Sequence, residues 1–197
     1  MASKVKIWNM ALVNVGSSGF IQSPTEDSEE ANHCRVVYDE AIKSTLESLD
    51  WNFARVKAAL SDLGTPDSDW LYQYAYPSNC VKARKILTTI RNEKPLPFQI
   101  GLNADANKKV VNTDVDSAIL VYTADIKNEA LFPSSFAIAL SWHVAMSIAG
   151  PLAGNDKKIM DKVNIGLAPS LARAEQLDAN EGQHDDEIDA PWIREYE

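Results

Sequence analysis

Three places in this sequence gather side chains of types that carry out chemistry. His33 stands beside Cys34, and a histidine that accepts the proton of a thiol creates a nucleophile. His143 follows Trp142 within an apolar segment. Residues 184–189 combine one imidazole with four carboxylates, which are groups that bind divalent cations. The first place suggests covalent catalysis, and the last suggests a metal-dependent reaction.

Each place also has a structural interpretation, which we favour. Neighbouring residues of a helix point in different directions, so His33 and Cys34 are not expected to act together. His143 is expected to be a core histidine bonded to a backbone or hydroxyl group. The acidic run lacks the glycine and the closing glutamate of an EF-hand loop, which favours a solvated or partner-binding segment. We therefore predict no catalytic residue, no metal site and no cofactor.

The charge of the chain is unevenly distributed. The formal net charge is −9 over 197 residues, which argues against a protein that grips nucleic acid through a basic surface. Residues 175–197 hold nine acidic groups and one basic group, whereas residues 1–174 are nearly neutral. Residues 82–109 contain seven basic groups against two acidic ones. The two cysteines offer no disulfide framework and fit a reducing compartment. We expect a protein kept under cytosol-like conditions.

Hydrophobic spacing predicts the helices. Apolar residues three and four positions apart predict a helix over 4–15 and a longer one from Pro24 to near Asp50, with Ser23 as its N-cap and Glu26 at its third position. Residues 130–155 carry no charged side chain, and their four serines, His143 and prolines favour a buried helix over a membrane span. A last helix begins near Asp156, with a kink or an interruption at Pro169.

Between these helices the sequence pattern changes to short runs of β-branched and aromatic residues. Strands are predicted over 70–76, 81–90, 98–102, 109–112 and 118–126, with a hairpin turn at 104–107. The fold class we expect is therefore mainly α: an antiparallel helical bundle from residues 1–51 and 130–181, a small inserted β-sheet or hairpin region over 52–129, and an extended acidic arm over 182–197.

The pattern favours an interaction protein. Its basic stretch and its acidic tail have opposite charges, so they could pair between identical copies and build a ring from heterologous contacts. The tail also ends in Trp192, Ile193 and Tyr196, and disordered solvating tails seldom carry two aromatic residues and an isoleucine so close together.

Several motifs together resemble one family. They are, in chain order, Ala11–Gly16 (ALVNVG), Asp27–Ala31 (DSEEA) with Cys34, Tyr38 and Leu46, Trp51–Arg55 (WNFAR), Tyr76–Cys80 (YPSNC), Phe132–Phe136 (FPSSF) and the turn in Ala145–Asn155. In their order and spacing, over roughly residues 11–180, they resemble the tail tubular protein A, or head-to-tail adaptor, family of short-tailed bacteriophages.

The resemblance implies a structural virion protein without enzymatic activity. In that family twelve copies form a ring between the portal protein and the tail nozzle, and the genome passes through the lumen without specific binding. The protein would be made in the host cytoplasm, would reside in the phage tail at its junction with the head, and would contact no membrane. The arm over 182–197 matches no family motif, so nothing is carried over to it.

On this basis we predict three sets of contact residues. The first set docks the arm on the portal or on an adjacent copy and consists of Pro191, Trp192, Ile193 and Tyr196. The second set contacts a neighbouring subunit or tail ring and consists of Lys82, Arg84, Lys85, Lys108, Lys109, Tyr72 and Tyr74. The third set forms the subunit core and consists of Phe136, Leu140, Val144 and Ile148. Two alternatives remain: a metal-dependent phosphate-ester or nucleic-acid enzyme that uses the acidic cluster near Asp185, and a small DNA-binding module that uses the basic stretch.

Overall fold

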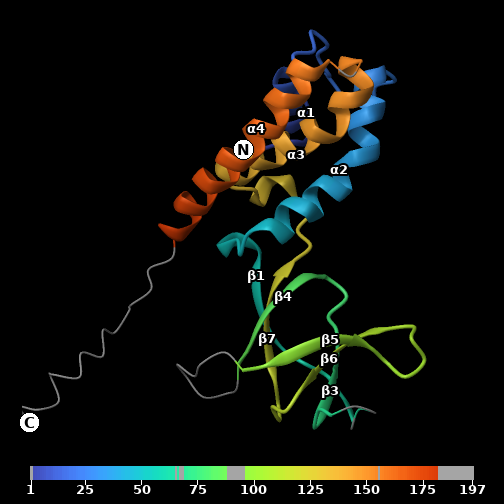
Figure 1. Ribbon diagram of the computed structural model, residues 1–197, viewed down its shortest axis with the longest axis vertical. Helices are drawn as coiled ribbons and strands as arrows, with labels where there is room; N and C mark the ends of the chain where they lie inside the picture. Colours follow the sequence, from blue (N-terminus) through green and yellow to red (C-terminus); the bar gives the residue numbers. More distant parts are fainter. Residues whose placement is uncertain (1, 65, 67–68, 88–95, 155, 182–197) are drawn as a thin grey trace, which may run out of the picture.

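The computed structural model describes residues 2–64, 66, 69–87, 96–154 and 156–181. Within this part of the chain, four α-helices gather at one end of an elongated molecule and the strands gather at the other (Figure 1). The helices are α1 (Lys4–Val15), α2 (Glu29–Ser48), α3 (Ser134–Ala153) and α4 (Lys157–Ala179).

The strands form two antiparallel sheets. One has the order β1-β7-β4, from β1 (Arg55–Ala59), β7 (Ile119–Ala124) and β4 (Cys80–Leu87). The other has the order β2-β3-β6-β5, from β2 (Asp62–Gly64), β3 (Tyr72–Ala75), β6 (Lys109–Thr113) and β5 (Phe98–Leu102). Strands β5 and β6 form the predicted hairpin, in which Asn103 Oδ1 accepts from the backbone N–H of Asn107 at 3.0 Å and of Lys108 at 2.9 Å.

This architecture shows that the predicted fold class was wrong. About 48% of the described residues are helical and 22% lie in strands, so the chain is an α/β protein rather than mainly an α-helical bundle with a small sheet. The prediction lacked β1 and β2, whose sequences RVKAA and DLG are short and poor in the residues that favour strands. They become strands because they pair with β7 and β3, which sequence periodicity does not reveal.

Helix α3 lies at the centre of the helical end because most of its surface is apolar. Phe136, Leu140, Val144 and Ile148 are fully buried among α1, α2 and α4. The ring of Phe136 packs edge-on against Trp51, with 4.9 Å between centroids. The four residues predicted for the subunit core thus lie in the interior of a single chain.

The helix ends differ from the prediction at one place. Helix α1 spans the predicted residues, and α2 begins at Glu29, with Ser28 rather than Ser23 as its N-cap. The carboxylate of Glu26 accepts from the backbone N–H groups of Gln22 and Ser23, which holds the preceding segment in a turn. Helix α4 continues through Pro169 without interruption.

Candidate interaction surfaces

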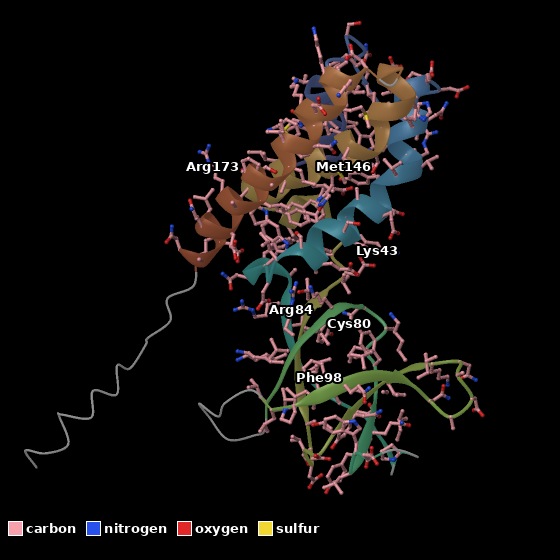
Figure 2. The ribbon with its side chains drawn as sticks, in the orientation of Figure 1. Lys43, Cys80, Arg84, Phe98, Met146 and Arg173 are labelled. Carbon is pink, nitrogen blue, oxygen red and sulfur yellow. The ribbon has the colours of Figure 1, made fainter. Side chains whose placement is uncertain are left out.

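The junction between helices and sheets is held by Arg84 of β4 (Figure 2). Its guanidinium donates to the backbone carbonyls of Leu46, at 3.1 Å, and Leu49, and its Nε donates to Thr123 Oγ1 at 2.8 Å. The carbonyls at the end of a helix have no partner within the helix and carry partial negative charge. Arg84 therefore caps α2 and joins it to the three-stranded sheet.

Other charges reinforce this junction. Lys82 Nζ donates to the carbonyl of Glu47 at 3.1 Å, and Arg55 Nη2 lies 3.1 Å from Asp50 Oδ2. Two of the basic residues predicted to contact a neighbour, Lys82 and Arg84, thus form hydrogen bonds within the chain. Lys85, on the same strand, is half-buried.

The remaining predicted contact residues lie on the four-stranded sheet or beside it. The rings of Tyr72 and Tyr74 stack with 6.3 Å between centroids, but Tyr74 is buried and donates to the carbonyl of Val115 at 2.8 Å. Lys108 and Lys109 are exposed, and Lys109 Nζ lies 5.6 Å from the ring centroid of Tyr76. The structure therefore leaves Lys108 and Lys109 accessible and places Tyr74 in the interior.

A second clamp joins α4 to the turn before β1. Asp178 is only 8% exposed, and its carboxylate accepts from the backbone N–H of Asn52. Burial raises the pKa of Asp178, and the hydrogen bond from Asn52 opposes part of that rise. This contact was not predicted, because an acidic residue in a strongly acidic segment resembles any other solvated charge.

The helical end carries an apolar groove between α1 and α3. Its volume is about 550 Å³, and its lining includes Val13, Phe20, Ile138 and Trp142. Val13 is 70% exposed and Phe20 is 72% exposed, which is unusual for side chains of this size and type within one contiguous groove. The groove thus has the character of an unpartnered contact surface.

We did not predict the groove residues, although the sequence contains a signal for them. Val13 lies off the buried face that contains Trp8, Leu12 and Val15, and Phe20 directly follows a Gly-Ser-Ser-Gly run. Apolar residues outside the face that packs the core are the ones free to meet a partner. That the groove exists at all depends on how α1 crosses α3.

The opposite end of the molecule also exposes apolar side chains. Leu63 of β2, Leu71 just before β3 and Leu102 of β5 are each more than half exposed. Strand β5 pairs with β6 on one side only among the described residues, so it is an edge of its sheet. We call Leu63, Leu71 and Leu102 the sheet-end leucines.

The residues considered for chemistry are placed in inert surroundings. Burial raises the pKa of the Cys34 thiol to about 12, which opposes formation of a thiolate. Thr45 Oγ1 donates its hydrogen bond to the carbonyl of Ala41, so it accepts a hydrogen bond from the N–H at His143 Nδ1, 2.7 Å away. Burial also lowers the pKa of His143 and favours the neutral ring. His143 is thus the hydrogen-bonded core histidine that we expected.

No three His, Cys, Asp or Glu side chains of the described residues form a group that could hold a metal ion. The acidic run at 184–189 and the predicted docking residues Pro191, Trp192, Ile193 and Tyr196 lie outside the described residues.

One described helix is long and apolar enough to cross a membrane by length and composition alone. It is the segment Ser134–Leu152 of α3, of which 56% is buried inside the protein. A core helix of a water-soluble protein satisfies the same two criteria. The burial of Phe136, Leu140, Val144 and Ile148 identifies α3 as the element around which the other helices pack.

The chain matches no protein-family model, and no curated protein matches its sequence.

Proposed function

We propose that this chain is a structural virion protein, a head-to-tail adaptor that assembles into a ring between a portal and a tail nozzle. The family assignment rests on the ordered motifs between residues 11 and 180. The structural observation that supports the proposal best is the exposed apolar groove lined by Val13, Phe20, Ile138 and Trp142. A groove of this kind is a surface for another protein, and a ring subunit needs such surfaces.

The shape of the chain also supports the proposal. The groove is lined by residues of α1 and α3 at the helical end, whereas the sheet-end leucines belong to the four-stranded sheet or to the segment just before β3. The helices and this sheet lie at opposite ends of the molecule (Figure 1). An adaptor must contact its own copies and, in addition, one partner above the ring and one below it. Two separated apolar surfaces on an elongated subunit suit that requirement.

Arg84 and Asp178 add rigidity at the junction of the two ends. The two clamps tie the sheets to the C-terminal ends of α2 and α4. A subunit that links two partners transmits their relative position only if its own two ends are fixed to each other. We assign the clamps this mechanical role in the adaptor.

Electron microscopy of the full chain, alone and mixed with the portal protein of the same phage, tests the proposal. We expect rings of twelve copies on the portal, and native mass spectrometry counts the subunits. A chain that forms no ring in either condition contradicts the proposal.

The same preparation separates the proposal from the alternatives. An adaptor releases no nucleotide in a nuclease assay with Mg²⁺, and it shows no strongly salt-dependent binding to duplex DNA. Metal-dependent cleavage favours the enzyme, and tight DNA binding that weakens steeply with salt favours the DNA-binding module.

A further inference from the structure

We propose that the aromatic end of the C-terminal arm, residues 191–196, of one copy docks into the α1–α3 groove of an adjacent copy. The inference rests on the proposed self-assembly and names the segment that covers the groove. Each copy would contribute one arm and accept one, which is the head-to-tail arrangement that closes into a ring.

The chemistry of the groove matches that of the arm. The groove presents Val13 and Phe20 largely to solvent and leaves Ile138 about half exposed, with the half-buried Trp142 in its wall. Residues 191–196 read PWIREY, so three large apolar or aromatic side chains lie within five positions. Aromatic side chains dominate protein contacts when they enter apolar pockets of this kind.

The charges of the two segments are also complementary. Residues 1–22, which build most of the groove, contain Lys4 and Lys6 and no acidic residue. Lys6 is exposed and lines the groove itself. Residues 182–197 contain six acidic residues and one arginine. Lys6 therefore offers the acidic part of the arm one opposite charge at the groove whose interior would accept the aromatic part.

The direction of α4 favours a neighbouring copy over the same chain. Asp178 fixes the last turn of α4 to Asn52 at the junction with the sheets. In Figure 1 this end of α4 points away from α1. The eighteen residues after α4 span about 60 Å at full extension, which is long enough to bridge two subunits in contact.

A fluorescent peptide of residues 183–197 tests docking directly. The acceptor is the full chain with W192A, I193A and Y196A, so that its own arm does not compete. We expect saturable binding by fluorescence anisotropy, weaker at high salt because the charges are exposed. Phe20→Asp in the acceptor should weaken binding about tenfold or more, since it places a charge in the apolar groove.

Val36→Asp is the matched control. Val36 is 83% exposed on α2 and does not line the groove, so this variant adds the same charge to the helical end without altering the proposed site. Both substitutions are at exposed positions, and circular dichroism verifies that both variants fold. No binding, or equal binding to the Phe20→Asp and Val36→Asp variants, overturns the inference.

Disulfide trapping distinguishes a neighbour from the same chain. One full chain carries V13C, a second with a mass tag carries R194C, and both carry C80A to remove the half-buried thiol. Oxidation should link the two chains by a disulfide bond, whereas a chain with V36C in place of V13C should form no such cross-link. If V13C and R194C cross-link only when they stand in one chain, the arm docks on its own subunit and the inference fails.

The failure of this inference can be told apart from the failure of the proposed function. Normal rings on the portal from the Phe20→Asp variant would overturn the arm-in-groove contact and leave the adaptor role intact. Absence of rings from the unaltered chain would instead contradict the adaptor role, and the peptide titration still reports on the groove.

Discussion

Both carboxylate oxygens of Asp178 accept the backbone N–H of Asn52, at 3.1 and 3.0 Å, and Asn52 Nδ2 donates to the carbonyl of Asp178 at 2.6 Å. This pair joins the last turn of α4 to the 3₁₀ turn that leads into β1. Residues 126 positions apart in sequence thus fix where the chain leaves the helical end for the sheets. With Arg84, the pair determines how the two ends of the molecule are held together.

Asp178→Ala should destabilise the fold by about 1–3 kcal/mol, because it leaves the N–H of Asn52 without its acceptor. Asp178→Asn should cost less, since its amide oxygen still accepts that hydrogen bond. Urea denaturation followed by circular dichroism measures both. Glu175→Ala, at an exposed acidic position on the same helix, should change the free energy of unfolding little. Equal losses at Asp178 and Glu175 would contradict a role for the clamp.

The pH dependence of stability should identify Asp178 as a buried carboxylate. Its pKa is raised by burial, so the folded state binds the proton more tightly than the unfolded state, whose pKa is near 3.8. The contribution is fully present below that value and is lost as pH rises through the folded pKa. Relative to the Asp178→Asn variant, the unaltered chain should therefore lose stability from about pH 4 toward neutral pH. If the unaltered chain instead gains stability relative to the Asp178→Asn variant as pH rises, the raised pKa is contradicted.

Arg84→Ala should destabilise the chain by about 1.5–3 kcal/mol, the range for hydrogen bonds made by a charged group. Arg84→Lys should recover only part of this, because an ammonium cannot reach Thr123 and the helix carbonyls in the planar geometry of a guanidinium. Guanidinium chloride denaturation provides the measurement. Lys85→Ala, one position along β4, is the control and should be nearly neutral. Full rescue by lysine would show that only the charge matters.

Phe136→Ala should cost about 3–5 kcal/mol, because it empties the centre of the aromatic cluster with Trp51, Phe53 and Phe132. Ile138→Ala, on the same helix but 48% exposed, should cost less than about 1 kcal/mol. Thermal unfolding compares the two. Similar losses would mean that the two faces of α3 are buried to a similar extent.

Gly166→Ala should destabilise α4 and disturb the groove. A Cβ at this position would overlap ring atoms of Trp142, so the ring must move. Overpacking of this kind costs about 1–3 kcal/mol, more than alanine gains over glycine in a helix. The free energy of unfolding and tryptophan fluorescence report the two effects. Gly101→Ala, whose Cβ would meet its nearest neighbour at 3.5 Å, is the control.

Features that depend on near neighbours were predictable from the sequence. The bounds of α1 follow from Ser3 and Gly16 at its ends and from its apolar spacing, and the hairpin of β5 and β6 follows from the polar turn between two strand-forming runs. The start of α2 was misplaced because Ser23 and Ser28 both carry capping signals. Only the turn held by Glu26 selects Ser28.

The amino-acid sequence alone specifies the hydrophobic spacing of the helices, the uneven distribution of charge and the apolar character of α3. These features depend only on residues that are near neighbours along the chain. The two-sheet architecture, the use of Arg84 within the chain, the burial of Asp178 and the groove at Val13 and Phe20 are set by the packing of distant segments. Strands β1 and β2 form their hydrogen bonds with partner strands elsewhere in the chain. Which apolar side chains stay exposed is known only when the packing of the core shows which ones are buried.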